Sequence, residues 1–217
     1  MRMNSVNEPS FWMGGRYATQ LLEITNDPSK IDEGFWAITT TFDGQFTAAK
    51  FGKVQDIQWP FDYRPLNSKN WVSSHTKTEY CQLVENFRNE ISLGNVYQVN
   101  ACRVLTLESS DKLIGLVAGF IKNNPAKYLG YLSIPGLEIA SASPETFIKR
   151  SGSQIKSSPI KGTRPSGISG EFSEKDQSEN IMIVDLMRND FGRICEPDRL
   201  IKVSGDADAI SKPGIER

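Results

Sequence analysis

Residues 128–158 read YLGYLSIPGLEIASASPETFIKRSGSQIKSS, and this stretch decides the fold class. Two runs rich in β-formers meet at Pro135-Gly136, and two further runs meet at Ser151-Gly152-Ser153. Proline, glycine and serine at such junctions are typical of tight turns between antiparallel strands. The stretch therefore predicts two successive β-hairpins.

More strands are predicted upstream of this stretch. In residues 35–51, two runs rich in Thr, Phe, Ile and Ala flank Asp43-Gly44, a pair that favours the type I′ turn of a hairpin. Residues 96–107 predict another strand. Residues 55–74 are rich in turn formers and resemble a linker.

Three helices are predicted among these strands. The first begins after Thr76, which forms a capping box with Glu79, and ends before Gly94. The second is predicted over residues 111–124, and the third, the most regular, over residues 173–189. Strands joined more by hairpins than by crossovers, with a few helices between them, indicate an α+β fold with antiparallel sheets.

The composition of the 217-residue chain excludes several classes of function. Lys and Arg total 25 against 26 Asp and Glu, so no basic excess exists to bind nucleic acid. The longest apolar stretch, residues 113–121, is far shorter than the roughly 18 residues that span a bilayer. The N-terminus lacks the apolar core of a secretory signal. We therefore expect a cytoplasmic protein with no nucleic-acid or membrane partner.

Histidine and cysteine usage narrows the possible chemistry. The only histidine, His75, precedes a helix start, where a solvated loop position is the favoured interpretation and a His-rich zinc site is excluded. Cys81, Cys102 and Cys195 are widely spaced, and we expect reduced core thiols. A bound metal would take carboxylate ligands, so Mg²⁺ is the expected ion.

Two polar segments are not explained by the strand pattern. Glu145 follows a proline at a strand boundary, where a solvated turn competes with a functional carboxylate. Residues 159–165, PIKGTRP, form a stiff loop with proline at both ends and glycine inside. Its KGT order differs from the GKT of a phosphate-binding loop, which argues against nucleotide binding.

The last predicted helix places a carboxylate on an apolar face. Glu179, Ile183 and Leu186 follow the spacing i, i+4, i+7, and burying an unpaired carboxylate is costly. Glu179 therefore has a partner such as Arg188, extends its carboxylate to solvent from the edge of the apolar face, or faces a cavity that holds a cation. Asp185 and Arg188 are more simply interpreted as a structural ion pair.

Four motifs together resemble the family of chorismate-utilising enzymes. They are GNVYQVN at 94–100, with Asn95 in place of the usual aspartate, SPE at 143–145, PIKGTRP at 159–165 and EKDQSENIMIVDLMRNDFGR at 174–193. The last motif resembles the family's helix almost letter for letter. Within the family, the sequence is most similar to the branch of aminodeoxychorismate synthase component I, or para-aminobenzoate synthase, over about residues 11–203.

The resemblance implies a reaction and assigns residues to it. Chorismate, with ammonia from a glutamine amidotransferase partner (component II), would give 4-amino-4-deoxychorismate on the way to para-aminobenzoate and folate. Lys161 matches a lysine that attacks the ring as a nucleophile, and Glu145 matches a general acid or base that assists loss of the ring hydroxyl. Glu179 matches a Mg²⁺ ligand. Substrate contacts would come from Gly162, Thr163 and Arg164.

Lys161 also separates the branches of the family, because anthranilate synthases are similar elsewhere but carry alanine at this position. A lysine can attack only when it is neutral, so the site would have to lower its pKa by desolvation or by nearby positive charge such as Arg164. The family fold implied for the chain is two antiparallel β-sheets packed face to face with helices outside.

The sequence also departs from the family. Ser166 stands where arginine is usual, residues 167–173 form a shorter loop, and the later family motifs have no counterpart. We expect residues 1–70 to form an N-terminal subdomain with hairpin and linker, and residues 71–217 to be the N-terminal half of a chorismate-binding domain that is inactive alone. An enzyme like anthranilate synthase component I, and a non-catalytic remnant or binding module, are the alternatives.

Overall fold

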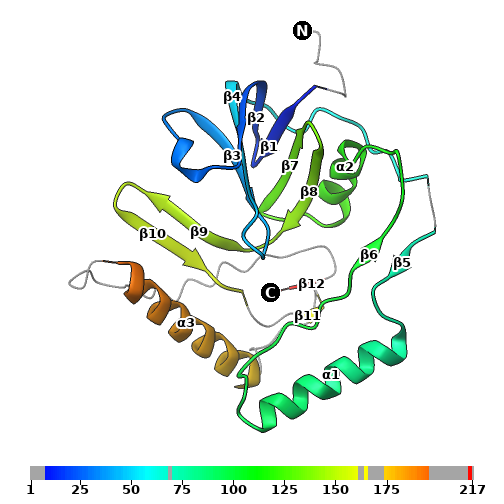
Figure 1. Ribbon diagram of the computed structural model, residues 1–217, viewed down its shortest axis with the longest axis vertical. Helices are drawn as coiled ribbons and strands as arrows, with labels where there is room; N and C mark the ends of the chain where they lie inside the picture. The colour runs from blue at the N-terminus through cyan, green and yellow to red at the C-terminus, as the bar shows by residue number, and fades with distance from the viewer. Residues whose placement is uncertain (1–7, 68–69, 161–163, 166–173, 196–214, 217) are drawn as a thin grey trace. The chain divides into compact units, whose positions relative to one another are not determined.

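Figure 1 shows the computed structural model of the chain, which describes residues 8–67, 70–160, 164–165, 174–195 and 215–216. The chain forms two compact units. The larger contains residues 1–64 and 113–217, and the smaller contains residues 65–112. The two units are defined by the compactness of each part of the chain. They do not test the predicted domain boundary after residue 70, which stays a prediction.

The larger unit is built on a six-stranded antiparallel sheet with the strand order β3-β4-β2-β1-β7-β8. Its strands are β1 (Ser10–Met13), β2 (Arg16–Thr25), β3 (Phe35–Thr40), β4 (Phe46–Asp56), β7 (Tyr128–Ile134) and β8 (Leu137–Ser143). The other elements are the 3₁₀ helix η1 (Pro28–Lys30), helices α2 (Ile114–Asn123) and α3 (Glu174–Ile194), and strands β9 (Thr146–Ser151), β10 (Gln154–Ser158), β11 (Arg164–Pro165) and β12 (Ile215–Glu216). The predicted α+β class with antiparallel sheets is confirmed, as are both hairpins of residues 128–158.

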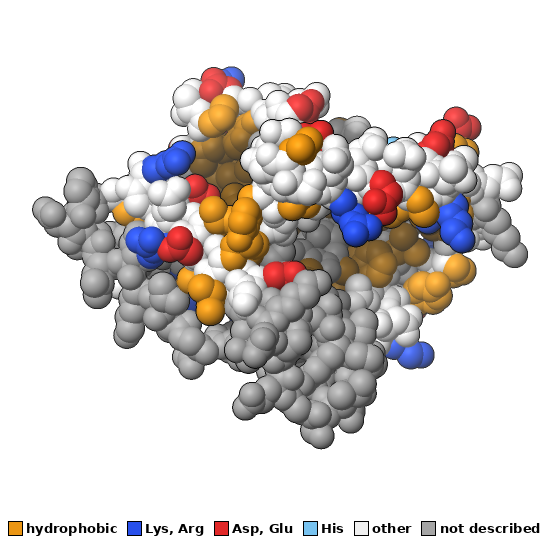
Figure 2. All heavy atoms as spheres, turned by 90° about the horizontal axis from the view of Figure 1, so that it is seen from below, with side chains coloured by type: hydrophobic (Ala, Val, Ile, Leu, Met, Phe, Trp, Pro, Cys, Tyr) orange, Lys and Arg blue, Asp and Glu red, His pale blue; other side chains and the backbone are white. Residues whose placement is uncertain are grey.

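The surface mixes apolar and charged side chains. On the face shown in Figure 2, hydrophobic side chains lie among both basic and acidic ones. Large exposed apolar side chains in the larger unit include Phe42, Phe147 and Ile181. None of the helices within the described ranges is long and apolar enough to cross a membrane.

The hairpin of β3 and β4 forms as predicted, but its turn differs. The strands pair out to Thr40 and Phe46, so a five-residue loop rather than a two-residue turn connects them. Gly44 has a φ of +88°, whereas Asp43 does not have the positive φ that a type I′ turn requires at both central residues. The Thr41 hydroxyl donates to the Asp43 carboxylate, and this local hydrogen bond favours the wider loop.

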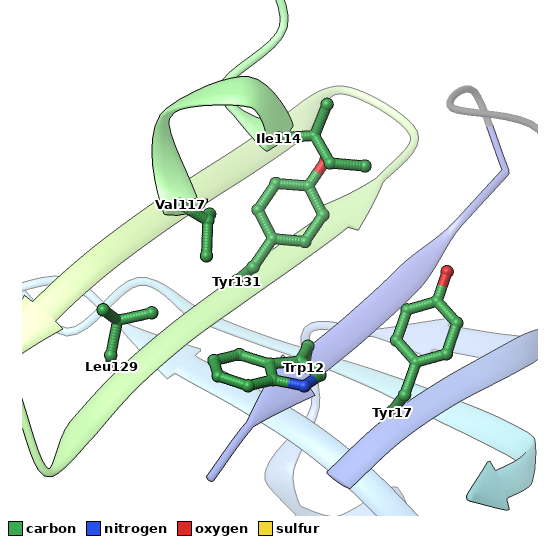
Figure 3. Close-up of a cluster of buried hydrophobic side chains, with 6 residues drawn as sticks. All are labelled: Trp12, Tyr17, Ile114, Val117, Leu129 and Tyr131. Atoms are coloured by element: carbon green, nitrogen blue, oxygen red, sulfur yellow. The ribbon is translucent and has the colours of Figure 1, made fainter. Parts of the chain in front are cut away.

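Alternation along the strands divides the apolar side chains of the sheet between its two faces. The first cluster, shown in Figure 3, consists of Trp12, Tyr17, Ile114, Val117, Leu129 and Tyr131. The second cluster consists of Ala18, Ala37, Ala49, Phe51, Leu132 and Ile134. Neighbours such as Tyr131 and Leu132 fall into different clusters, as a period of two residues requires. Both faces of the sheet are therefore apolar.

Helix α2 is fixed to the first cluster by one carboxylate. The Tyr131 hydroxyl donates to Oε1 of Glu138 at 2.6 Å, and the same oxygen accepts the backbone N–H of Ile114 at 3.3 Å. A carboxylate at a helix N-terminus satisfies a free N–H group and interacts favourably with the helix dipole. Burial, reinforced by Glu138, raises the pKa of Tyr131 above its ordinary value, so the hydroxyl remains a donor.

Glycine in α2 allows the chain before residue 65 to approach the helix closely. The backbone N–H of Arg64 donates to the Gly115 carbonyl at 2.9 Å. A Cβ atom on Gly115 would lie 2.6 Å from the Cβ atom of Arg64, so any side chain there would force the two segments apart. Just upstream, Trp59 and Phe61 pack against the first cluster, with ring centroids 5.3 Å apart.

The smaller unit contains helix α1 (Lys77–Ser92) and a ladder of β5 (Val72–Ser73) and β6 (Leu105–Thr106). The predicted capping box is confirmed. The Thr76 hydroxyl accepts the Glu79 N–H at 3.3 Å, and the Glu79 carboxylate accepts the Thr76 N–H at 2.8 Å. Gly94, with a φ of +75°, follows the helix end as predicted.

The strand predicted over residues 96–107 forms only at Leu105–Thr106. Residues 96–104 are irregular, and Val96, Tyr97 and Val104 are exposed. A strand requires a hydrogen-bonding neighbour. Within the described part of the smaller unit, the two residues of β5 are the neighbour that is available, so the prediction was wrong for most of the segment.

The cysteines are free, as expected, but they are not core residues. Cys81 and Cys102 are exposed, and Cys195 is half-buried. Cys81 lies on α1, a helix without a fully buried residue, which explains its exposure. His75 lies in the loop before α1, and its Nδ1 atom is 2.8 Å from the Ser74 hydroxyl.

The Tyr131 hydroxyl provides a test of how α2 is held. We expect Tyr131→Phe to lower the free energy of unfolding by about 1–3 kcal/mol, because it removes a hydrogen bond to a carboxylate. Urea unfolding followed by tryptophan fluorescence measures the change. Tyr128→Phe removes a hydroxyl from the same strand outside this group, and should cost less than about 0.5 kcal/mol. Equal losses in the two variants would contradict the assignment.

Asp111 provides a pH-dependent test in the smaller unit. Its carboxylate accepts the backbone N–H of Asn67 at 2.7 Å, the Asn67 side-chain amide at 2.8 Å and the Ser109 hydroxyl at 3.0 Å. These hydrogen bonds, the backbone one first, lower the pKa of Asp111. Because the folded pKa lies below the unfolded one, the stabilisation is present above the unfolded pKa and is lost as pH falls through the folded pKa.

We therefore expect Asp111→Asn to accelerate hydrogen exchange at the Asn67 amide at neutral pH. The difference from the wild type should shrink once the pH falls below about 4. Asp62→Asn, a change of the same chemistry in the larger unit, serves as the control. An exchange difference that stays constant down to about pH 2 would show that the Asp111 carboxylate does not close this loop.

Candidate functional site

Predicted site segments meet at one end of the β9–β10 ladder. Thr146, the first residue of β9, pairs with Ser158, the last residue of β10. Glu145 directly precedes Thr146 and is exposed. The loop of residues 159–165 directly follows Ser158. The antiparallel register therefore brings Glu145 and the start of this loop to the same end of the ladder.

A β-bulge shapes this end of the ladder. The register shifts between Lys156 and Ser158, so that Phe147 and Ile148 of β9 both lie opposite Ser157. Bulges bend a strand and redirect its side chains. Phe147 is 83% exposed and its neighbour Ile148 is 46% exposed, so the usual alternation of buried and exposed side chains is lost here.

Two hydroxyl groups hold the turn that carries Glu145. The Ser143 hydroxyl donates to the Glu145 carbonyl at 3.2 Å, and the Ser157 hydroxyl donates to the Thr146 carbonyl at 3.2 Å. The Thr146 residue itself is buried. The two peptide groups that follow the Glu145 Cα atom are thus held by side chains from β8 and from β10. The sequence placed Ser143 in the SPE motif without assigning it a role, and it did not identify Ser157, because the contacts of both depend on register and on the bulge.

Helix α3 runs past β10 at the same place. The Sδ atom of Met187 lies 3.9 Å from the Ser157 hydroxyl. Glu179, Ile183 and Met187 follow the spacing i, i+4, i+8 on one helix face, and all three are half-buried. Leu186, predicted to share this face, is 46% exposed, so the apolar face runs through Met187 instead.

The ion pair predicted on the outer part of α3 is confirmed. Nη2 of Arg188 lies 2.7 Å from Oδ1 of Asp185, and both side chains are exposed. Ser173, the first residue predicted for this helix, lies outside the described residues. The helix extends to Ile194, beyond the predicted end at residue 189.

The remaining predicted site residues are described only in part. Lys161, Gly162 and Thr163 lie outside the described residues. The backbone of Arg164 belongs to β11, where it pairs with Glu216 of β12. Among the residues that the structure describes, it brings together the Glu145 turn, the end of β10 and helix α3, which carries Glu179.

Carboxylate and other metal-ligand side chains are not gathered into a complete metal site within the described residues. No group of three or more His, Cys, Asp or Glu side chains that could hold an ion occurs among them. Glu179 is the one metal ligand that the sequence predicted, and it lies within the described residues. Mg²⁺ commonly takes one or two protein carboxylates and keeps several waters, so one carboxylate is a partial fit to the ion.

Comparison with known proteins identifies the family. The family of the chorismate binding enzyme matches residues 60–204. Aminodeoxychorismate synthase of Streptomyces pristinaespiralis is 37% identical over 56% of this chain and 18% of that protein. Aminodeoxychorismate synthase component 1 of Bacillus subtilis is 31% identical over 61% of this chain and 30% of that protein.

Anthranilate synthases are also similar. Anthranilate synthase component 1 of Streptomyces coelicolor is 30% identical over 72% of this chain and 33% of that protein. The chain thus spans at most a third of the length of these three relatives. The family match covers more than half of the 217 residues and includes β9, β10 and all of α3, so the chain belongs to the family of chorismate binding enzymes.

Proposed function

We propose that this chain contributes to the reaction of aminodeoxychorismate synthase component I, in which chorismate and ammonia give 4-amino-4-deoxychorismate. The observation that carries the proposal is Lys161 in the loop PIKGTRP, because the otherwise similar anthranilate synthases have alanine at this position. The relatives from Streptomyces pristinaespiralis and Bacillus subtilis support the same branch. The proposal concerns the part of the reaction that the residues of this chain supply.

In this reaction Lys161 acts as the nucleophile and Glu145 as the acid. The neutral amine of Lys161 forms a C–N bond to the ring, while Glu145 donates a proton to the ring hydroxyl, which leaves as water. Ammonia then attacks the ring, and the bond between the ring and the lysine nitrogen breaks to release the neutral lysine amine. The added nitrogen gives its extra proton to the Glu145 carboxylate, which restores the acid. The ladder register supports these paired roles, because Thr146 lies opposite Ser158. Glu145 and the lysine loop therefore leave the same end of the ladder.

The lysine loop also supplies substrate binding in this proposal. A positive charge beside a lysine favours the neutral amine, and Arg164, three residues after Lys161, is the cation assigned to this role. Chorismate carries carboxylates, which backbone N–H groups, hydroxyls and guanidinium groups can bind. The residues assigned to these contacts are Gly162, Thr163 and Arg164.

Glu179 is the residue assigned to Mg²⁺. When bound, the ion would supply positive charge for a substrate carboxylate. Because the described residues provide one ligand rather than a complete site, no step of the reaction is assigned to the ion. The proposal further assigns ammonia delivery to a glutamine amidotransferase partner, the product to para-aminobenzoate and folate synthesis, and the protein to the cytoplasm.

One alternative rests on a specific observation. The anthranilate synthase relative from Streptomyces coelicolor aligns with 72% of this chain, more than the aminodeoxychorismate synthases from Streptomyces pristinaespiralis and Bacillus subtilis. An anthranilate-forming enzyme of the same family is therefore the second candidate. A binding module without chemistry is the third, and it predicts chorismate binding without product.

The identity of the product separates these candidates. We expect chorismate, ammonia and Mg²⁺ to give 4-amino-4-deoxychorismate, detected by liquid chromatography and mass spectrometry. We expect this product from a fusion that appends the region of the Bacillus subtilis relative beyond its match, whereas the 217-residue chain, assayed in parallel, should be inactive alone. Anthranilate as the product would establish the second candidate. Bound chorismate without product in both proteins would establish the third.

The role of Lys161 is tested in the same fusion. We expect Lys161→Ala to reduce kcat more than it weakens chorismate binding, because it removes the attacking group. Lys161→Arg should not restore activity, since a guanidinium stays protonated and cannot attack carbon. Without ammonia, the wild type should accumulate an adduct on Lys161 that intact-protein mass spectrometry detects.

Lys156→Ala, which removes an exposed lysine from β10, is the matched control and should retain both turnover and the adduct. Near-normal turnover in Lys161→Ala would mean that the lysine is merely a loop cation.

A further inference from the structure

We propose that Ser157 is a positioning residue that fixes the direction of Glu145, an inference that rests on the proposed function. Ser157 lies in β10, next to the end of the ladder, and is half-buried. Its own side chain is a neutral hydroxyl, which can donate one hydrogen bond and accept others. The role follows from what this hydroxyl contacts.

The bulge makes the hydroxyl of Ser157 important for the backbone beside Glu145. Phe147 and Ile148 both lie opposite Ser157, and a bulge of this kind disrupts the ladder hydrogen bonds locally. The Ser157 hydroxyl donates to the Thr146 carbonyl at 3.2 Å and so provides a hydrogen-bond partner one residue past Glu145. The Ser157 side chain thus supplies a hydrogen-bond donor at the point where the backbone hydrogen bonds of the β9–β10 ladder are disrupted.

A second hydroxyl holds the preceding carbonyl group of the same turn. Ser143 donates to the Glu145 carbonyl at 3.2 Å. Two consecutive carbonyl groups, those of Glu145 and Thr146, are therefore held by side chains from two different strands. Holding these peptide groups limits backbone rotation on the C-terminal side of Glu145 and so constrains the direction of its Cα–Cβ bond, although its exposed side chain is not packed.

Ser157 differs from Ser143 because it also contacts α3. The Ser157 hydroxyl lies 3.9 Å from Sδ of Met187, and Glu179 is on the same helix face, two turns earlier. One side chain thus contacts the turn that carries the proposed acid and the helix that carries the proposed Mg²⁺ ligand. Loss of the hydroxyl should loosen the Glu145 turn first, because the carbonyl is a stronger acceptor than a thioether sulfur.

The experiment compares Ser157→Ala, Ser157→Thr and Ser158→Ala. The first removes the hydroxyl, the second keeps it, and the third removes the neighbouring hydroxyl on the same strand. Hydrogen exchange is measured by mass spectrometry in the 217-residue chain on peptides that cover residues 144–148. We expect Ser157→Ala to accelerate this exchange about tenfold, which is the size of one lost hydrogen bond, while Ser157→Thr and Ser158→Ala stay near the wild type.

The kinetic readout uses whichever protein converts chorismate, the 217-residue chain or the fusion. We expect Ser157→Ala to lower kcat about tenfold with KM changed less than about twofold, because the acid is misaligned while substrate contacts remain. Ser157→Thr should restore kcat to within about twofold of the wild type. A purely structural serine would not give this split between kcat and KM.

The two readouts separate failure of this inference from failure of the proposed function. Unchanged exchange in Ser157→Ala, or the same loss in Ser157→Thr, overturns the positioning role whether or not the protein is active. Faster exchange in Ser157→Ala with an unchanged kcat also overturns it. If exchange is faster but the protein neither binds nor converts chorismate, the contact between Ser157 and the turn is supported. The proposed function is contradicted instead.

Discussion

The pairing of β1 with β7 is the constraint on which the larger unit depends. It sets Ser10 opposite Ser133 and Met13 opposite Gly130, and so joins the first strands of the chain to the later hairpin. Both apolar clusters combine side chains from the two sides of this pairing. A contact between such distant residues forms only after a large loss of chain entropy, so its stability must come from the burial of both sheet faces.

The parts of the fold that sequence predicts are those set by neighbouring residues. The capping box of Thr76 and Glu79 and the turn at Pro135-Gly136 use contacts within a few positions, and both are present. The β1–β7 pairing leaves no local signal, because alternating side chains fit many partners. The strand that was predicted at residues 96–104 but did not form also shows this dependence on a pairing partner. Its residues favour extended backbone, but a strand also requires a neighbour.

The candidate site likewise contains features that the sequence predicts and features that it does not. The Asp185–Arg188 ion pair is set by helix spacing and was predicted correctly, whereas Leu186, predicted on the apolar face of the same helix, is 46% exposed. Two positions one residue apart differ by about 100° around a helix, so the boundary of an apolar stripe depends on what the helix packs against. The contact of α3 with Ser157 decides that boundary in favour of Met187.

The close approach of Arg64 to Gly115 lies where the chain leaves the larger unit and where it re-enters it. The chain leaves the larger unit after Arg64 and returns to it at Leu113, and the hydrogen bond between Arg64 and Gly115 ties these two points together. Asn67 and Asp111 close the smaller unit at its own two ends. Residues 65–112 are therefore an insert with adjacent ends, and a short linker in their place would leave all six strands of the large sheet intact.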